Sequence, residues 1–490
     1  MNNPEIASWK EVRAALKKIW GYENFRPPQG EIVRSLLSKR DALIVLPTGG
    51  GKSICFQLPA LLKTGLTLVV SPLVALMENQ VQELCYLQLP AALLHSELPT
   101  YQRRQTLQAL ERQKLRLLYL SPETLLSAPV WEKLCQPQLK INGLILDEAH
   151  CLVQWGDTFR PAYRRLGAVR TALLQYKPQG TKIAIAAFTA TADLNAQQTI
   201  CKVLQLQQPE IFLISPYREN LQLRVQTVLT PRGRRQQMLR FIRARNQQTG
   251  LVYVRSRRES EELAEWFGQL GYATAAYHAG LSPQQRRTIE ASWLGGKTQF
   301  AVCTCAFGMG INKPDVRWVV HFCPPQLLSE YIQEVGRGGR DGKPADALML
   351  ISEPTGWLNP EDKQRRQFFA AKMRSQYQDA QRLVKQLPQQ GEVATVARQF
   401  RDGAVALGLL HSANQLEWLD PFHYRQQHSP QSISLGHLIA KQQQLFHQMN
   451  KYLTTGKCRW QFLLGAFGFT KEADGFRCGN CDNCVTHYRY

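Results

Sequence analysis

The chain has 490 residues, enough for two or more domains of roughly 100 to 200 residues each. It carries 60 Lys and Arg against 38 Asp and Glu, a formal net charge of +22, so an extended polyanion is the natural partner, although such a surface can also serve solubility alone. No stretch approaches the roughly 18 consecutive apolar residues of a membrane-spanning helix, and the N-terminus lacks a charged-then-apolar leader, so a soluble, non-secreted chain is expected.

Short apolar runs alternate with longer amphipathic, charged segments up to about residue 350. Such alternation predicts βαβ units built on parallel sheets that are buried on both faces. The polar, Pro-containing stretch Leu213–Arg224 interrupts the rhythm and is expected to join two α/β lobes. Beyond Pro354 the apolar runs give way to a Gln- and Arg-rich helical periodicity. The nine runs expected to be strands are residues 42–47, 66–72, 116–122, 143–148, 182–188, 249–254, 299–304, 317–322 and 346–351.

The first of these runs leads into a glycine-rich turn, PTGGGKS, after which a helix is expected to begin at Lys52 and Ser53. Backbone N–H groups at such a helix start hold phosphates, and the glycines 49–51 let the chain approach them closely. Lys52 is expected to meet the β- and γ-phosphate oxygens, and Ser53 to reach Mg²⁺. The strict phosphate-loop pattern requires Gly where Leu46 stands, so for the turn alone a chance match stays open.

The fourth run, residues 143–148, ends in two acids, Asp147 and Glu148. Asp147 is expected to hold the Mg²⁺ shell, and Glu148 to orient water for attack on the γ-phosphate. An acidic helix cap after a strand is the alternative. Together with the glycine-rich turn, the two acids indicate nucleoside triphosphate hydrolysis.

The second lobe contains YIQEVGRGGRDG, in which Arg337 and Arg340 are expected to lie three residues apart on a helix face. Guanidinium groups in such positions can reach phosphoryl oxygens across a cleft when two lobes close, which would couple hydrolysis to movement. A solvated basic helix explains the same charges.

Through these and further motifs, over roughly residues 8–350, the chain resembles the RecQ DNA helicases of helicase superfamily 2. Many superfamily 2 enzymes share a phosphate loop and a DEAH box, whereas TGGGKS, QWG..FRP and FGMGINKP together are close to specific for RecQ. The motifs that carry the resemblance are WGYENFRPPQ, LPTGGGKS, VVSPLVALMENQV, LLYLSPE, DEAHCLVQWGDTFRPAY, AFTATA, YHAGLSPQQR, AFGMGINKPDVRWVVH and QEVGRGGRDG.

The resemblance implies that ATP is the nucleotide, because Tyr22 would stack on adenine while Arg26 and Gln29 read it. Thr189 and Thr191 of AFTATA would couple hydrolysis to strand movement. The expected catalytic residues are Lys52, Asp147, Glu148, Arg337 and Arg340. The expected nucleotide-binding residues are Tyr22, Arg26, Gln29, Thr48, Gly49, Gly50, Gly51, Lys52 and Ser53.

The resemblance also implies DNA contacts in two segments. The aromatic-rich loop after the DEAH box would sense single-stranded DNA through Trp155, Phe159, Arg160 and Tyr163, since aromatic rings stack on unpaired bases of any identity. Without the resemblance, burial in the core is the better interpretation of these aromatic residues. The second-lobe residues implied to contact the DNA backbone and the nucleotide are Thr304, Gly308, Gly310, Asn312 and Lys313.

Three positions depart from the family pattern. Gly338 stands where Ala is usual, Asp157 where His is common, and Pro28 where Gly is usual. None of them removes a charge that the chemistry needs. Asp157 adjoins the DNA-sensing loop, where it could weaken DNA binding or change its coupling to hydrolysis.

Most of the twelve cysteines are scattered, several in apolar runs, which fits buried thiols in a reducing compartment. Near the C-terminus, Cys478, Cys481 and Cys484 form C-x-x-C-x-x-C, and three thiolates cannot complete a tetrahedral site. The resemblance implies that Cys458, upstream, is the fourth ligand of a structural Zn²⁺. An iron–sulfur cluster is the alternative, although the Pro-flanked fourth Cys of cluster motifs is missing.

The link from Gly342 to Cys458 is longer than the family's usual helical link, and six residues follow Cys484. The winged-helix and HRDC domains that usually follow the zinc are therefore expected to be absent from that place. Residues 375–425 read as three helices and then two short apolar runs around SANQ, which predicts a relocated winged helix. Its hairpin would carry Trp418 to duplex DNA, with 413–415 as the turn. An extra helical pair that only pads the interface is the alternative.

The expected fold is α/β: two tandem RecA-like parallel-sheet lobes, residues 1–214 and 215–355, then a mostly helical region, 356–440, and a small four-cysteine zinc-binding subdomain, 441–490. The resemblance implies an ATP-dependent DNA helicase that moves 3′ to 5′ on single-stranded DNA, unwinds duplexes and serves repair or recombination. An ATP-driven translocase or RNA remodeller, and a binding scaffold with a dead ATP site, are the alternatives. The expected cofactors are ATP, Mg²⁺ and Zn²⁺. The expected partners are single-stranded and duplex DNA, bound by a monomer in the cytoplasm, at the nucleoid if the source is prokaryotic.

Overall fold

The structure is a computed structural model that describes residues 8–154, 160–308, 311, 313–353, 357–358, 360–427 and 435–486. The chain divides into two compact units, of which the first contains Met1–Ile214 and Arg374–Ile439, and the second Ser215–Met373 and Ala440–Tyr490. The chain therefore passes between the units three times. Two of these passages lie within long helices, which are α15 (Glu361–Val384) and α18 (Leu435–Thr454).

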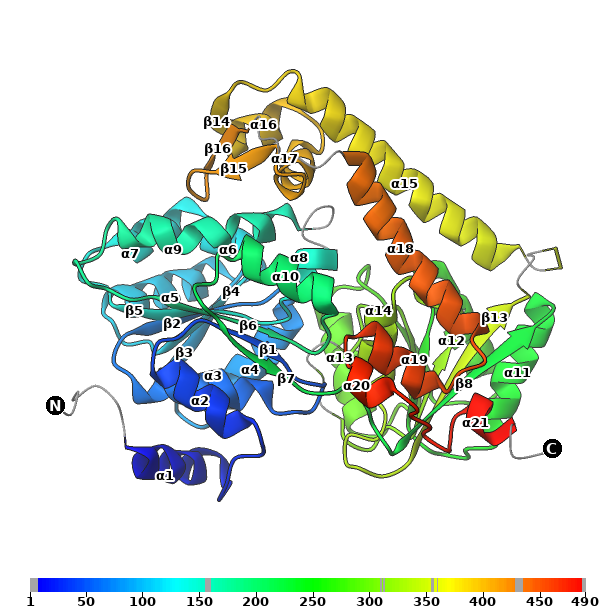
Figure 1. Ribbon diagram of the computed structural model, residues 1–490. Coiled ribbons are helices and arrows are strands. Elements are labelled where there is room, and N and C mark those ends of the chain that lie inside the picture. The colour runs from blue at the N-terminus through cyan, green and yellow to red at the C-terminus, as the bar shows by residue number, and fades with distance from the viewer. Residues whose placement is uncertain are drawn as a thin grey trace. The chain divides into compact units, whose positions relative to one another are not determined.

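A seven-stranded parallel sheet forms the centre of the first unit, in the order β3-β4-β2-β5-β6-β1-β7, and helices lie on both of its faces (Figure 1). The strands are β1 (Ala42–Val45), β2 (Leu66–Val70), β3 (Ala91–Leu94), β4 (Leu117–Leu120), β5 (Ile141–Leu146), β6 (Ala184–Thr189) and β7 (Glu210–Leu213). The helices are α1 (Trp9–Trp20), α2 (Gln29–Leu37), α3 (Lys52–Leu62), α4 (Val74–Tyr86), α5 (Thr100–Glu111), α6 (Pro122–Leu125), α7 (Ala128–Cys135), α8 (Cys151–Gln154), the 3₁₀ helix η1 (Pro161–Arg165), α9 (Gly167–Leu174) and α10 (Leu194–Val203).

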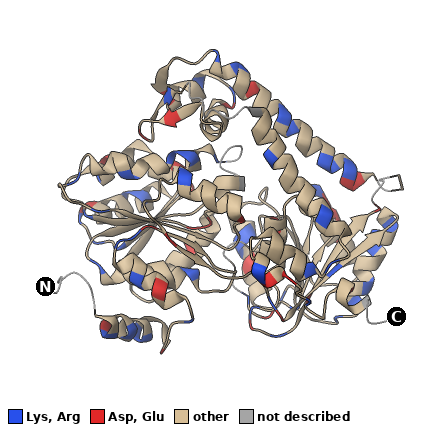
Figure 2. Cartoon of the chain, in the orientation of Figure 1, with Lys and Arg blue, Asp and Glu red and all other residues tan. Residues whose placement is uncertain are grey.

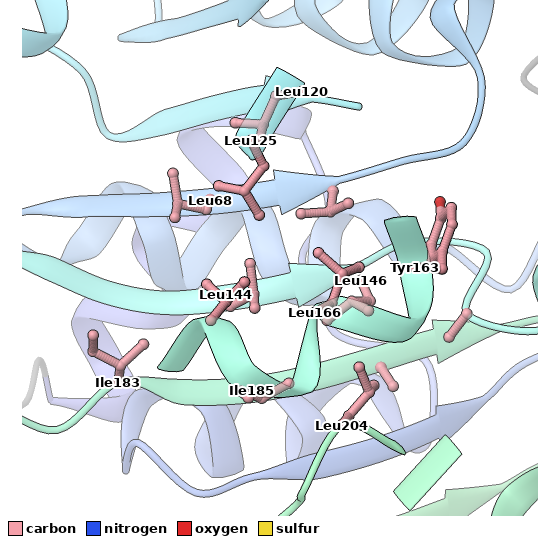
Figure 3. Packing of buried hydrophobic residues seen from close by; sticks show 14 of the residues in the cluster. Leu68, Leu120, Leu125, Leu144, Leu146, Tyr163, Leu166, Ile183, Ile185 and Leu204 are labelled. Atoms are coloured by element: carbon pink, nitrogen blue, oxygen red, sulfur yellow. The ribbon is translucent and has the colours of Figure 1, made fainter. Parts of the chain in front are cut away.

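Both faces of this sheet are buried. Along β5, Leu144 and Leu146 belong to one apolar cluster and Ile145 to the other, because successive side chains of a strand point to opposite faces. Figure 3 shows the first cluster, in which Leu68 and Leu120 of neighbouring strands pack with residues of the covering helices. Burial on both faces explains why these strands are continuous apolar runs rather than alternating ones.

A six-stranded parallel sheet forms the centre of the second unit, in the order β10-β11-β9-β12-β13-β8. The strands are β8 (Leu221–Val228), β9 (Gly250–Tyr253), β10 (Thr274–Tyr277), β11 (Phe300–Cys303), β12 (Trp318–His321) and β13 (Ala345–Ser352). The helices between them are α11 (Pro231–Arg243), α12 (Arg257–Gln269), α13 (Pro283–Leu294) and α14 (Leu328–Val335).

The C-terminal helices share a core with the second sheet. They are α19 (Arg459–Ala466), α20 (Thr470–Ala473) and α21 (Asp482–Thr486). One apolar cluster contains Leu221 of β8, Tyr331 of α14 and Trp460 of α19. The indole Nε1 of Trp460 donates to the carbonyl oxygen of Leu221 at 3.2 Å, so the edge strand β8 is held to the C-terminal helices.

A small module, residues 390–427, belongs to the first unit. Its antiparallel sheet has the order β14-β16-β15. The sequence places its hairpin turn at 413–415, which is wrong, because those residues join α17 to β15 and the hairpin turn is 419–422. The elements are β14 (Gln390–Glu392), α16 (Val393–Gln399), α17 (Gly403–Ser412), β15 (Leu416–Trp418) and β16 (His423–Gln426).

Each of the nine apolar runs expected to be strands overlaps one, and both large sheets are parallel. The predicted architecture of two RecA-like lobes, a helical C-terminal region and a cysteine cluster is confirmed. Among the described residues, no helix combines the length and the apolar character that crossing a membrane requires.

Candidate nucleotide site and metal centre

The glycine-rich turn joins β1 to α3 as predicted, with Lys52 as the first residue of the helix. Gly49 and Gly51 have φ angles of 86° and 73°, a left-handed conformation that glycine adopts without a steric penalty. A Cβ atom at Gly50 would lie 3.0 Å from the carbonyl oxygen of Pro47. The tight turn therefore depends on its glycines, and it presents the free N–H groups of a helix start to an anion.

Gln29, at the start of α2, holds this turn. Its Nε2 donates to the carbonyl oxygen of Gly50 at 2.9 Å, and its Oε1 accepts from the backbone N–H of Arg26 at 3.0 Å. Tyr22 is 51% exposed, so its ring is accessible for stacking on a base. The nucleotide contacts expected of these residues, and of the partly exposed Thr48 and Ser53, stay predictions.

The two acids directly follow β5. Asp147 is 4% exposed, and its carboxylate accepts from the backbone N–H of Glu148 at 3.0 Å and from Gln80 Nε2 at 3.4 Å. Burial, together with the neighbouring charge of Glu148, raises the pKa of Asp147 to about 6. Glu148 Oε1 lies 3.6 Å from Lys52 Nζ. The fold thus assembles an ammonium and two carboxylates at the carboxyl ends of β1 and β5, where parallel sheets bind ligands.

His150 connects these acids to the segment AFTATA. Its Nδ1 lies 3.2 Å from Glu148 Oε2 and 3.2 Å from the hydroxyl of Thr189, the last residue of β6. That hydroxyl donates to the carbonyl oxygen of Thr191 at 3.0 Å. Glu148 has a φ of 50°, which is rare for a residue with a side chain and is typical of strained functional positions.

Arg337 and Arg340 follow α14 rather than lying on it, so the predicted helix face is wrong. The helix ends two residues before Arg337, and its glycine-rich continuation forms turns. Arg337 is 8% exposed and donates to the carbonyl oxygen of Gly308, while Arg340 donates to that of Ile311 at 2.9 Å. A Cβ at Gly308 would lie 2.6 Å from Arg337 Nε. Both guanidinium groups are thus bound to the FGMGINKP backbone of their own lobe.

Lys313 is 7% exposed inside the second lobe. Its Nζ donates to the carbonyl oxygen of Leu294 at 3.2 Å and lies 3.4 Å from the carboxylate of Asp315. The expected contact of Lys313 with DNA stays a prediction. Thr304, just after β11, is partly exposed, and its DNA contact stays a prediction. Two further residues expected in this motif lie outside the described residues, namely Gly310 and Asn312.

The aromatic-rich loop is described only at its two ends, and Trp155 and Phe159 lie outside the described residues. Tyr163 is fully buried in the core of the first lobe (Figure 3), so its expected stacking on bases is wrong. Arg160 is partly exposed, with its guanidinium 3.0 Å from the carboxylate of Glu123. Its contact with DNA stays a prediction.

The sulfur atoms of Cys458, Cys478, Cys481 and Cys484 all lie within 4.8 Å of one another, although the residues come from separate parts of the chain. Cys458 is the N-cap residue of α19, and its sulfur accepts from the backbone N–H of Cys478 at 3.3 Å. Hydrogen bonds from the Cys478 and Cys481 thiols lower the pKa of Cys458. Four thiolates at this separation suit a tetrahedral metal with bonds of about 2.3 Å, the geometry of structural zinc.

The residues beside the cluster bind it to the second sheet. Arg459 and Asp482 form a two-pronged ion pair, with both N···O distances 2.9 Å. Asp482 also accepts from the backbone N–H of Val225, in β8, at 2.9 Å, and Asn480 donates to the carbonyl oxygen of Glu219 at 3.0 Å. The cluster therefore holds the end of the chain against the edge strand β8.

Two residues of the nucleotide site were not predicted. Gln80 of α4 reaches Asp147, and His150 joins Glu148 to Thr189. His150 had a signal, since it completes the DEAH sequence. Gln80 had only its place within the motif VVSPLVALMENQV.

Three family models match the chain. They are a DEAD/DEAH box helicase model over residues 26–200, a helicase conserved C-terminal domain over 233–342, and a RecQ zinc-binding model over 428–485. These matches give ATP with Mg²⁺ as the cofactors of the motor and, together with the four cysteines, Zn²⁺ as the metal.

The chain is 53% identical over 484 residues to the ATP-dependent DNA helicase RecQ of Synechocystis sp., covering 98% of this chain and 99% of that protein. It is 37% identical to the RecQ of Pasteurella multocida, covering 74% of this chain and about half, 56%, of that one. The solved structure of Mycobacterium smegmatis helicase Lhr with single-stranded DNA and AMP-PNP matches 71% of this chain and 47% of Lhr, with a TM-score of 0.57 at 19% identity. This last likeness concerns the fold alone.

Proposed function

The chain belongs to the RecQ family of ATP-dependent DNA helicases, and we propose how it uses ATP hydrolysis on DNA. In this proposal, hydrolysis drives 3′-to-5′ movement along single-stranded DNA and separates duplexes during repair or recombination. The protein acts as a monomer in the cytoplasm or at the nucleoid.

A continuous line of polar contacts in the first lobe carries the proposal. It runs from Lys52 through Glu148 and His150 to Thr189, at distances of 3.6, 3.2 and 3.2 Å. Lys52 follows β1, the acids follow β5, and Thr189 ends β6. The residues expected at the triphosphate are therefore in direct contact with the segment expected to transmit hydrolysis to DNA.

We assign the chemical roles as follows. The ammonium of Lys52 neutralises β- and γ-phosphate oxygens, and the backbone N–H groups at the start of α3 bind the phosphates. Asp147 would hold Mg²⁺, which when bound screens the developing phosphate charge. Glu148 orients the attacking water and accepts its proton. Because burial favours the neutral form of Asp147, nearby positive charge is needed to keep this carboxylate ionised.

Basic side chains supply the expected contacts with DNA phosphates. Figure 2 shows Lys and Arg along α11 and α15. Phosphate contacts release counterions, so DNA affinity is expected to fall steeply with salt. The exposed basic residues of these two helices include Arg232, Arg235, Arg240, Arg243, Lys363, Arg366, Lys372 and Arg374.

A strand-release assay tests the proposal. We expect the protein with ATP and Mg²⁺ to separate a DNA duplex with a 3′ single-stranded tail, and not one with a 5′ tail. Glu148→Gln is the matched control, since it keeps the shape of the side chain and removes the base, and it should bind the same DNA without separating it. Release from the 5′-tailed duplex alone would refute the polarity.

The same assay on a tailed RNA duplex addresses the RNA remodeller. Equal or faster release from RNA would favour remodelling over DNA unwinding. ATP hydrolysis that DNA stimulates, without release of any strand, would favour a translocase. DNA binding without any turnover would favour a scaffold with a dead ATP site.

A further inference from the structure

The helix α17 of the small module lacks charge. Together with the end of α15, the module runs helix, strand, helix, helix, strand, strand, an order that supports the predicted winged-helix-like arrangement. In helix-turn-helix proteins the second helix of the motif enters the major groove, and here that helix is α17. Its sequence, GAVALGLLHS, contains no Lys, Arg, Asp or Glu, and Leu407, Leu409 and Leu410 are fully buried. It therefore offers no charged group to phosphates or to guanine.

α17 instead packs on the first lobe, where it contacts η1. Polar contacts hold the turns at both ends of β15. Lys202 Nζ, from α10, donates to Asn414 Oδ1 at 2.9 Å, and Arg165 Nη1, from η1, donates to the carbonyl oxygen of Pro421 at 3.1 Å. Arg165 is partly buried, and this burial lowers the pKa of its guanidinium to about 10. A polar group that is withdrawn from water needs a hydrogen-bond partner, and the carbonyl group of Pro421 supplies one.

Phe422 adds an apolar contact from the hairpin turn. Its ring lies 5.2 Å from the ring of Trp131, in α7, with an interplanar angle of 76°. The same side chain packs against the main apolar cluster of the first lobe. Three elements of the lobe, α7, η1 and α10, thus hold the module.

The segment covered by α17 is the one that ends the aromatic-rich loop. η1 begins directly after Arg160, and Trp155 and Phe159 precede it in the chain. Tyr163 fixes one side of η1 in the lobe core. α17 packs against η1 as well. The C-terminal end of the loop is therefore placed by the lobe and by the module together.

We infer that the small module is a positioning element for the aromatic-rich loop. Docking of α17 and of the hairpin turn fixes η1, and so sets how strongly single-stranded DNA stimulates ATP hydrolysis. α17 is occupied by this contact and does not enter a DNA groove. Phe422 is the positioning residue whose loss loosens the contact. The inference rests on the proposed function, because it concerns the DNA response of the same ATPase.

Phe422→Ala in the full chain tests the inference. At saturating single-stranded DNA, we expect the stimulated kcat to fall by about three- to thirtyfold, a range typical of mutations between coupled sites. The rate without DNA and the KM for ATP should stay unchanged, since Phe422 touches neither nucleotide nor acids. Phe422→Leu, which keeps an apolar side chain there, should restore most of the stimulation. A stimulated kcat equal to that of the parent chain would overturn the inference.

Arg398→Ala and Arg401→Ala are the matched controls. Both residues are exposed on the module. Under the inference they leave stimulation and duplex affinity unchanged. If instead they weaken duplex binding and unwinding while Phe422→Ala does not, the module grips DNA through its open face and the inference is wrong.

Lys202→Ala decides the matter if Phe422→Ala fails to fold. Lys202 is exposed, and its removal deletes one contact with Asn414, so a loss of stimulation of about twofold is expected. Unchanged stimulation in Lys202→Ala would then overturn the inference. A parent chain whose ATPase does not respond to DNA would refute the proposed function itself, which is a separate outcome.

Discussion

The predicted nucleotide-site residues of the two lobes differ in the partners that their side chains have. In the first lobe, Lys52 and Glu148 approach each other at the carboxyl ends of β1 and β5, two strands of the same parallel sheet. In the second lobe, Arg337 and Arg340 donate to backbone carbonyl groups of their own lobe. The first set is assembled to receive a ligand, whereas the second set already has internal partners.

This difference has a physical consequence for catalysis. A guanidinium as buried as that of Arg337 cannot give up its carbonyl partner without another acceptor, because an unpaired buried charge is costly. If Arg337 acts on a triphosphate, phosphoryl oxygens must replace the Gly308 carbonyl. Binding of the nucleotide would then be linked to the position of the FGMGINKP segment.

Arg337→Ala is the variant that tests this difference between the lobes with the largest expected effect. If the guanidinium stabilises the transition state, kcat for ATP should fall by about 10³- to 10⁵-fold, as for other arginines of this kind. Arg258→Ala, on the exposed surface of α12, should have no effect. Normal kcat with a lowered melting temperature would show that Arg337 only holds the Gly308 loop.

Lys52→Ala tests the set of residues that the first lobe brings together. Loss of the ammonium should lower DNA-stimulated kcat by about 10²- to 10³-fold or more, the cost of removing one preorganised charge partner. DNA binding, measured by fluorescence anisotropy, should change little. Lys182→Ala, an exposed lysine of the same lobe, serves as the control. Turnover that survives in Lys52→Ala would refute the assignment of the site.

Cys481→Ser tests the metal centre, whose four cysteines lie in the second unit. Metal analysis of the parent protein should give about one zinc per chain and no iron, and the variant should lose most of it. Because the C-terminal helices share a core with β8, the variant should also unfold at a lower temperature. Cys85→Ser, an exposed cysteine of the first unit, should keep both zinc and stability. A brown protein with iron and labile sulfide would contradict the zinc assignment.

Glu334→Gln tests the buried ionic contacts that hold α14 in the second lobe. Glu334 is buried between Arg255 and His321, with N···O distances of 2.8 Å to each. Burial alone would raise the pKa of Glu334, but the Arg255 guanidinium and His321 lower it from 4.5 to about 2. A carboxyl with a depressed pKa stabilises the folded state above pH 4.5, and this contribution disappears as pH falls from 4.5 to about 2.

Urea unfolding at several pH values measures this effect. At neutral pH, Glu334→Gln should lower the free energy of unfolding by about 3–5 kcal/mol, since it leaves the Arg255 charge buried without its partner. Its stability should also change less than that of the parent between pH 4.5 and 2. Glu262→Gln, in an exposed pair with Arg258, is the control and should cost nothing measurable. Equal pH profiles for the parent and Glu334→Gln would contradict the depressed pKa.

The sequence predicts those parts of the molecule that depend on local pattern. Apolar runs without alternation mark strands buried on both faces, and all nine formed strands. The glycine turn and the acids fall at the carboxyl ends of such strands, so their convergence follows from the parallel topology. The fourth cysteine required the family resemblance, because a helix start 20 positions upstream of Cys478 has no spacing rule.

The expected stacking of Tyr163 on bases failed because long-range packing decides where this ring lies. Nothing near Tyr163 in the sequence shows that it fills the lobe core. Two local signals were missed. The glycines of GRGGRDG end α14 before Arg337, and the Asp-Pro pair at 420–421 marks the hairpin turn that was placed at 413–415. Short strands such as β14 give too little pattern to be recognised.

The central claim concerns the nucleotide site formed by Lys52, Asp147 and Glu148. Contacts through His150 and Thr189 couple ATP hydrolysis at this site to movement of DNA. Thr189→Val keeps the volume of this buried side chain and removes the hydroxyl that lies 3.2 Å from His150. The direct measurement is the number of base pairs separated per ATP hydrolysed on a 3′-tailed duplex. We predict that this ratio falls about tenfold while most of the ATPase activity is kept. A ratio equal to that of the parent chain would contradict the claim.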